Sequence, residues 1–395
     1  MTDLLAIIKE KASLYKAEVI EIRRHLHQNP ELSFQEFNTS KFVCGKLDEY
    51  GIEYQKGIVE TGIVGLIKGN NPTKKTIALR ADLDALPILE ENDVTYKSVN
   101  EGVMHACGHD VHTSSLLGAA KMLNEVKDQF EGTVKLIFQP GEEKLPGGAS
   151  LMIKEGVLEN PSPETIIGQH VYPPLESGKV GFRSGMYMAS CDELYVTIKG
   201  KGGHAALPHQ NIDPILISSH IIVALQQLVS RVIPPTVPAV LSFGNIIGKG
   251  ATNVIPDKVE LEGTFRAMNE EWRSIAHDKM VKMAETIAVS MGGVCDFRIE
   301  KGYPFLVNDE NVTNTAKTAA VQFLGKENVV DLDLRMTAED FAYYSQVKPA
   351  CFYRLGVKDD QTPTTGLHTS TFNIDERAIE TSIGLMAWIA LKELQ

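Results

Sequence analysis

The sequence predicts an α/β domain with a mixed, largely parallel sheet, interrupted by an inserted ferredoxin-like α+β domain. Two observations carry this prediction. Short runs rich in Ile, Val and Leu alternate with helical patterns in the first part of the chain. From about residue 186, apolar residues alternate one by one with polar residues instead. We therefore expect an outer domain of residues 1–185 and 299–395, and an inserted satellite domain of residues 186–298.

The outer domain begins with strands and helices in alternation. Apolar runs predict strands at 62–69, 76–85, 133–140 and 165–170. Helical patterns lie before or between them, near 15–28, 36–50 and 113–127. Strands separated by helices are typical of a parallel sheet that is covered on both faces.

The inserted domain has the element order strand, helix, strand, strand, helix, strand. The strands are predicted at 193–200, 238–248, 258–268 and 295–300, and the helices at 213–232 and 270–291. This is the ferredoxin-like order. The clean alternation of apolar and polar residues predicts a sheet with one face in solvent or against a partner.

Composition narrows the possible functions. The chain has 395 residues, and its formal net charge of -12 argues against binding to the phosphates of nucleic acids. No apolar run approaches the roughly 20 residues of a membrane span, so no membrane partner is expected. Five widely separated cysteines predict no disulfide framework, and the N-terminus lacks the features of a signal peptide. The expected compartment is the cytoplasm.

Clusters of chemically reactive residue types mark a candidate site in the outer domain. They are Arg80 to Asp84, Met104 to Asp110, Gln139 to Glu143, Gln169-His170 and Leu367-His368. Three of these clusters lie at the carboxyl end of a predicted strand. Open α/β sheets bind their ligands at that edge.

These clusters contain the donor types of a transition-metal site. Thiol, imidazole and carboxylate groups come from Cys107, His109, Glu143, His170 and His368. Such donors suit Zn, Mn, Co or Ni rather than Ca or Mg. Glu142 and Glu143 repel each other unless a cation or a proton lies between them, and one glutamate on a metal with the other beside a metal-activated water resolves this.

Simpler interpretations of the same residues stay open at this point. A pair of adjacent glutamates is usually a solvated helix face. His170 on its own is more often an ordinary core or surface residue, and Cys107 can be a small buried residue. Cys107 and His109 can also form a nucleophilic dyad that needs no metal.

Several motifs in order resemble the M20 metallopeptidase family, in particular its amidohydrolase branch. That branch includes hippurate hydrolases, N-acyl-amino acid amidohydrolases and auxin-conjugate hydrolases. The motifs are Arg24-His25-Leu26-His27 through Pro30-Glu31, ALRADLDALP, MHACGHDVHT, QPGEE, KGGHAALPHQNIDPI, ATNVIPDKVELEGTFRA and AEDFA. They cover nearly the whole chain.

The resemblance implies a metal-dependent hydrolase that cleaves the amide bond of N-acyl amino acids, such as hippurate-like compounds, to a carboxylic acid and an amino acid. The five donor residues above would hold two divalent ions, with Cys107 near the place of an aspartate that bridges the metals in other branches. Glu142 would act as general base and acid for attack by metal-bound hydroxide. Asp84 would orient a ligand imidazole, and Asp82 stands where other branches keep a metal-binding histidine.

The inserted domain resembles the satellite domain of the family, which commonly pairs two subunits, so a homodimer is expected. His204 matches a histidine that in relatives reaches the neighbouring subunit's site and touches the substrate or its developing oxyanion. Asn253 and Arg266 match positions that hold the substrate carboxylate. One departure is Lys144-Leu145-Pro146, which precedes Gly147-Gly148 where the branch usually has a Gly-rich stretch.

Three alternatives accompany this interpretation. The first is a dipeptidase or aminoacylase of the same family. The second is a catalytically silent binding protein on the same fold, against which the retention of Glu142 and of the whole ligand set argues. The third is a metal-free hydrolase that uses Cys107 and His109.

Overall fold

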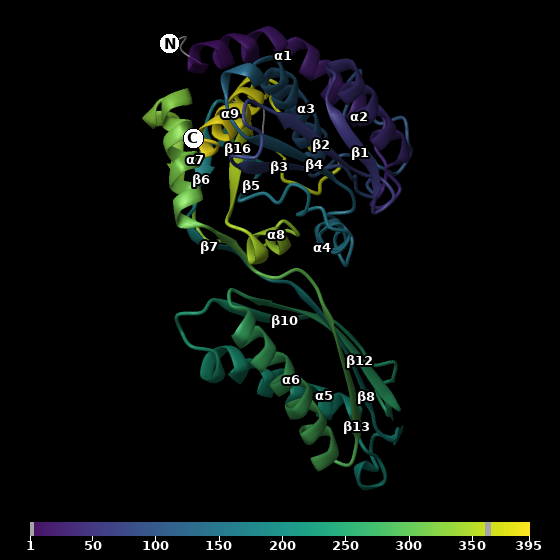
Figure 1. The fold of residues 1–395 in the computed structure, drawn as a ribbon. Helices are drawn as coiled ribbons and strands as arrows, with labels where there is room; N and C mark the ends of the chain where they lie inside the picture. The colour runs from purple at the N-terminus through teal and green to yellow at the C-terminus, as the bar shows by residue number, and fades with distance from the viewer. Residues whose placement is uncertain (1–3, 360–364) are drawn as a thin grey trace. The chain divides into compact units, whose positions relative to one another are not determined.

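The computed structural model describes residues 4–359 and 365–395, and the chain divides into two compact units (Figure 1). Unit 1 comprises Met1–Tyr187, Val307–Leu334 and Asp340–Gln395. Unit 2 comprises Met188–Leu306 and Arg335–Glu339. The chain passes between the units within strands β7 (Gly185–Met188) and β14 (Leu306–Asn308), and again on either side of Arg335–Glu339.

The end of the inserted domain lies farther along the chain than the sequence predicts. The expected boundary after residue 298 falls inside strand β13 (Val294–Lys301). This strand pairs with β8 (Asp192–Lys199) over its whole length. The boundary at 298 is therefore wrong, because a cut there would break a continuous ladder.

Unit 1 is built on a mixed sheet of eight strands in the order β1-β2-β4-β3-β5-β16-β6-β15. Their bounds are β1 (Glu53–Ile58), β2 (Gly62–Lys68), β3 (Thr76–Asp82), β4 (Thr133–Gln139), β5 (Thr165–Glu176), β6 (Val180–Phe182), β15 (Val329–Asp331) and β16 (Ala350–Lys358). The central strands β4, β3, β5 and β16 run parallel to their neighbours in this group. The prediction of a mixed, largely parallel sheet is confirmed.

Helices cover both faces of this sheet (Figure 1). They are α1 (Leu4–Gln28), α2 (Phe37–Tyr50), α3 (His109–Glu125), α4 (Gly148–Lys154), α7 (Glu310–Leu324), α8 (Ala342–Val347) and α9 (Ala378–Glu393). Alternate residues of β3 serve the two faces: Ile77 and Leu79 join the core beneath α1, α3 and α9, whereas Arg80 lies under the Phe341 ring that precedes α8.

Unit 2 is a four-stranded antiparallel sheet in the order β10-β12-β8-β13, with β10 (Ala239–Ile247) and β12 (Lys258–Ala267). Helices α5 (Pro214–Gln227) and α6 (Glu270–Ser290) share one core with its apolar face. Both helices start at capped residues, because the Asp213 and Asn269 side chains accept backbone N–H groups of the first turn. The ferredoxin-like order is confirmed.

Short elements complete the described chain. They are β9 (Gly203–His204), β11 (Val254–Ile255), the 3-10 turns Lys127–Gln129, Pro208–Gln210 and Lys326–Asn328, and a π-helical turn at Leu228–Val232.

The helical stretch Pro214–Val232 corrects one expectation of the sequence analysis. By length and composition it is apolar enough to cross a membrane, with a mean hydropathy of 1.5. Polar residues such as Ser218 and His220 interrupt it, so no uninterrupted apolar run is visible in the sequence. Helices of a domain core pass the same test, and here Ile217, Ile221 and Leu225 lie in the core of unit 2.

Candidate metal centre and active site

Three parallel strands bring polar residues to one edge of the unit 1 sheet. Asp82 at the end of β3 pairs with Gln139 at the end of β4. Arg80 pairs with Gly168 of β5, so His170, two residues farther on, lies level with Asp82. This is the carboxyl edge, where parallel sheets bind their ligands.

Helix α3 starts at this edge because a glycine precedes it. Gly108 has a left-handed φ of 86°. A Cβ atom at this position would lie 2.5 Å from a methyl group of Val171, the neighbour of His170. The glycine therefore lets Cys107 and His109, which flank it, approach β5.

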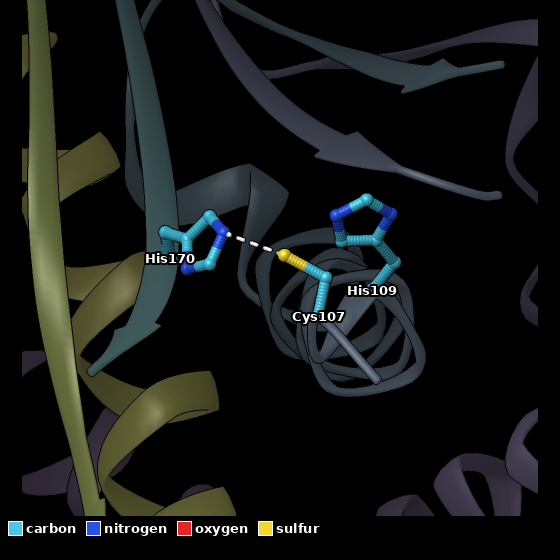
Figure 2. Close-up of side chains that lie close together, drawn as sticks. All are labelled: Cys107, His109 and His170. Atoms are coloured by element: carbon cyan, nitrogen blue, oxygen red, sulfur yellow. Dashed lines mark hydrogen bonds between the residues drawn. The ribbon is translucent and has the colours of Figure 1, made fainter. Parts of the chain in front are cut away.

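The structure brings the five predicted ligands together in two overlapping groups. Figure 2 shows the first group, in which Cys107 Sγ lies 3.4 Å from His170 Nε2 and His109 stands beside them. The donor atoms of Cys107, Glu143 and His368 form the second. Within each group the donor atoms lie within 4.8 Å of one another. Cys107 belongs to both groups, which suits a thiolate shared by two cations.

The imidazole of His109 fits a metal ligand. Its Nε2 atom is buried and has no hydrogen-bond partner among the described residues. Burial alone would lower the pKa of His109, but the carboxylates of Asp82 and Asp84 outweigh it and raise the pKa to about 10. The negative field that holds a proton on this ring would hold a divalent cation equally well. Together with the donor types, this supports a metal site.

The thiol of Cys107 hydrogen-bonds to His170, whereas the alternative of a nucleophilic dyad pairs it with His109. Burial holds the pKa of the Cys107 thiol well above its usual range, and the negative charges of Glu143 and Glu142 raise this pKa further. Burial holds the pKa of His170 well below its usual range, and the positive charge of Arg354 lowers this pKa further. Protein groups alone thus favour a neutral thiol and a neutral imidazole, and a thiolate here needs a cation beside it.

The two adjacent glutamates point to different partners. Glu142 is buried, its Oε1 accepts the backbone N–H of Asp340 at 3.3 Å, and its Oε2 lies 3.9 Å from His109 Nε2. Glu143 Oε1 lies 3.1 Å from His368 Nε2. This divergence suits one carboxylate as a ligand and the other as a proton carrier.

Asp84 fixes the loop that carries both glutamates. Its carboxylate accepts the backbone N–H groups of Glu142 and Glu143 at 3.0 and 2.9 Å, and the hydroxyl of Ser33 at 2.7 Å. Asp84 Oδ1 also lies 3.2 Å from His109 Nδ1. Asp84 is therefore placed to orient an imidazole and the catalytic loop together.

His368 reaches the site from the loop that precedes α9. Its φ of 60° is in the left-handed region, which non-glycine residues rarely adopt. Its backbone N–H donates to the carbonyl of Ala106 at 2.8 Å, next to Cys107. Glu143 chiefly raises the pKa of His368. This single backbone bond links the loops that carry two of the ligands.

Asp82 is part of a buried hydrogen-bond network behind the donor groups. Its Oδ1 lies 2.6 Å from Nδ1 of His112, whose Nε2 accepts the N–H of Val171 at 2.9 Å. Its Oδ2 accepts from Arg80, which also donates to Asp340. Both nitrogens of His112 are thus occupied. His112 and Asp340 lie within the motifs MHACGHDVHT and AEDFA, but no role was predicted for either residue.

A second buried network gives the N-terminal motif a role. Asp110 in the first turn of α3 accepts from Arg23 Nε at 2.7 Å, and its Oδ2 lies 2.8 Å from His27 Nδ1. His27 Nε2 lies 3.1 Å from Glu90, and Arg23 also donates to Asn373 at 3.1 Å. This network ties α1 to the start of α3 and to the segment after His368.

The three site residues predicted in the inserted domain lie at two places in unit 2. His204 pairs with Val254, and the carbonyl of Asn253 accepts the N–H of Ala205 at 3.0 Å, so His204 and Asn253 are close in the backbone. Arg266 lies next to the last residue of β12, where its Nε donates to the Thr264 hydroxyl at 3.1 Å.

The pattern of peptidase family M20/M25/M40 matches residues 78–392. The chain belongs to this family. Hydrolase relatives at about 40% identity support a metal-dependent amidohydrolase, as the resemblance implied.

Individual relatives agree along nearly the whole chain. An N-acetyl-L-cysteine deacetylase of Bacillus subtilis (strain 168) is 41% identical over 381 residues, which cover 95% of this chain and 89% of that protein. An IAA-amino acid hydrolase of Arabidopsis thaliana is 40% identical over 403 residues, covering 99% and 91%. A Bacillus subtilis structure described as a dinuclear metal-binding peptidase of the M20 family is 36% identical, covers 97% and 99%, and superposes with a TM-score of 0.83.

Proposed function

We propose that this M20 amidohydrolase removes the acyl group from N-acyl amino acids, with hippurate-like compounds among its substrates. The observation that carries the proposal is the buried carboxylate of Glu142 beside the ligand groups that share Cys107. The names of similar proteins support the substrate class. They include the deacetylase and the IAA-amino acid hydrolase above, and an N-acyl-L-amino acid amidohydrolase of Geobacillus stearothermophilus that is 41% identical over 301 residues.

Two divalent ions are proposed for the two donor groups. Cys107, His109 and His170 would hold one ion, and Cys107, Glu143 and His368 the other. Zn, Mn, Co and Ni all accept this mixture of thiolate, imidazole and carboxylate. When bound, the ions would supply Lewis acidity that acidifies water and polarises an amide carbonyl.

The chain's own residues would carry the proton. Glu142 accepts the proton of the attacking water. The N–H of Asp340 holds its carboxylate in place, and Asp84 holds its backbone. Glu142 then delivers this proton to the amine nitrogen as the carbon–nitrogen bond breaks. Asp84 keeps the His109 ring in place throughout.

Unit 2 would bind the other end of the substrate. Arg266 and Asn253 would hold its carboxylate, and His204 would stabilise the negative charge on the carbonyl oxygen. One chain does not bring the three together. The segment that leads to His204 is held at the start of β12, where Asp257 accepts the N–H groups of Gly200 and Gly202, whereas Arg266 is nine residues beyond Asp257 in sequence. At about 3.3 Å per residue that is roughly 30 Å.

We infer that a homodimer completes the site, with His204 and Asn253 of the partner subunit joining Arg266 of the first. The surface of unit 2 supports this. Exposed apolar side chains lie on α5 and on the edge strand β10; they are Ile215, Leu216, Val223, Val240, Ile246 and Ile247. Only 28% of the apolar stretch that contains α5 is buried in one chain. A second copy would cover this surface and the open edge of β10.

The homodimer predicts a specific effect of charge on α5. Val223 is 73% exposed there, and V223E should give monomers because a buried carboxylate would oppose the interface. Loss of an oxyanion donor should lower kcat by at least about 100-fold. Sedimentation velocity and kinetics would measure both. The matched control is V289E on α6, at a residue that is 68% exposed, and it should stay dimeric and active. A wild-type chain that is monomeric and fully active would refute the shared site.

The substrate class is tested with a panel of compounds. N-acetyl- and N-benzoyl-amino acids should be hydrolysed with release of the free amino acid. The corresponding N-acyl amino acid amides keep the acyl group but lack the free carboxylate. Their kcat/KM should be about 10- to 100-fold lower because a charge-assisted pairing with Arg266 is lost. Preference for dipeptides with a free amino group would instead favour the dipeptidase alternative.

The cytoplasm remains the proposed compartment. All five cysteines are free thiols in the structure, which suits a reducing environment.

A further inference from the structure

Glu36 is a fully buried carboxylate that the proposed mechanism does not use. Its Oε1 accepts the backbone N–H of Gly141 at 2.8 Å and that of Phe34 at 2.9 Å. Its Oε2 accepts the hydroxyl of Thr61 at 2.8 Å. Gly141 directly precedes Glu142, so this carboxylate acts on the backbone of the catalytic loop.

The loop of Glu142 is held by carboxylates at three successive residues. Glu36 binds the N–H of Gly141, and Asp84 binds the N–H groups of Glu142 and Glu143. Asp84 is in turn held by Ser33. The segment that contains Ser33 and Glu36 thus holds the loop directly at Gly141 and, through Asp84, at Glu142 and Glu143.

Packing reinforces these bonds at Gly141. This residue has a left-handed φ of 61°, and a Cβ atom there would lie 2.4 Å from the ring of Phe34. The glycine therefore lets the loop lie directly on Phe34, and Glu36 joins the two segments by accepting the backbone N–H groups of both residues. Backbone movement at Gly141 would displace the carboxylate of Glu142.

We propose that Glu36 is a positioning residue for Glu142, acting through the N–H of Gly141. The inference deepens the proposed function and rests on Glu142 being the proton carrier. The role is geometric. Burial and the nearby charge of Asp84 raise the pKa of Glu36 to about 7, so an uncharged side chain is tolerated at this position near neutral pH.

Two conservative variants of Glu36 separate the effect of side-chain length from the effect of side-chain charge. E36Q keeps the reach, since its carbonyl oxygen can accept both N–H groups and its amide can donate to the Thr61 hydroxyl. E36D keeps the charge but is one methylene too short for Gly141. We expect kcat of E36Q within about threefold of wild type and kcat of E36D lower by about 100-fold, the cost of misplacing a catalytic group by about 1 Å. KM and bound metal should change little in either.

A control addresses general loss of stability. Asp309 is a carboxylate of unit 1 that accepts two backbone N–H groups, those of Asn311 and Val312, at the start of α7. D309A should lower the melting temperature without changing kcat. Equal losses in E36Q and E36D, unchanged kcat in E36D, or a matching loss in D309A would each overturn the proposal.

Crystal structures of the two variants keep this test separate from the proposed function. The carboxylate of Glu142 should shift in E36D and stay in place in E36Q. If the wild-type protein hydrolyses no N-acyl amino acid, the proposed function fails, and these structures still decide whether Glu36 positions the loop. An unshifted Glu142 in E36D would refute the inference by itself.

Discussion

Replacing Glu142 with glutamine is expected to lower kcat for amide hydrolysis by roughly 10²- to 10⁴-fold, the contribution of general acid–base catalysis. The neighbouring carboxylates are engaged elsewhere. Glu143 lies against His368, and Asp84 accepts two backbone N–H groups and the Ser33 hydroxyl. Glutamine is isosteric and can still accept the N–H of Asp340, so the fold of the loop should persist.

The measurement is steady-state kinetics with metal analysis of the same sample. E142Q should bind as much metal as the wild type, because Glu142 is not among the proposed ligands. E143Q serves as the contrast, since it removes a ligand of the group with Cys107 and His368 and should bind less metal. Wild-type turnover in metal-loaded E142Q would remove Glu142 from the mechanism.

Replacing Cys107 with alanine is the second large effect. Cys107 is the residue that the two donor groups have in common, so its loss weakens both. We expect the variant to retain fewer than two metal equivalents. Loss of a group that merely supports a ligand already costs about 10- to 100-fold in affinity or activity, so kcat should fall by more than this.

Two further variants sharpen the Cys107 prediction. C107D supplies a carboxylate that can also be shared by two ions, and it should recover metal binding and part of the activity. C44A removes another buried thiol of unit 1, on α2, and should keep both metal and activity. In the cobalt-loaded protein, the sulfur-to-cobalt absorption band should vanish in C107A and persist in C44A. A C107A variant with full metal and full activity would show that the thiol is no ligand.

Local patterns in the sequence predicted the parts of the molecule that depend on neighbouring residues. Alternation marks β8 and β12 because only one face of each strand is buried, and continuous apolar runs mark β3 and β4 because both faces are buried. The donor residues were predicted as one site because motifs at the ends of parallel strands meet at one edge. The edge strand β1 was missed, since five of its six residues are exposed or half-buried.

The supports of the site could not be predicted, because they join segments far apart in the chain. Glu36 and Gly141 are separated by 105 positions, and Arg80 and Asp340 by 260. A lone buried glutamate has no periodic signal before the fold is known. His112 could have been found, since its position one turn after His109 places it on the same side of α3.

The most direct test of the central claim is activity as a function of added metal. Chelator-treated protein would be titrated with Zn, Mn, Co or Ni while hydrolysis of an N-acyl amino acid is followed, with E142Q carried in parallel. We predict no hydrolysis by the stripped protein, recovery that is complete at two equivalents per chain, and no recovery in E142Q. Hydrolysis by the stripped protein, or equal recovery in E142Q, would contradict the assignment of the metal centre and of its proton carrier.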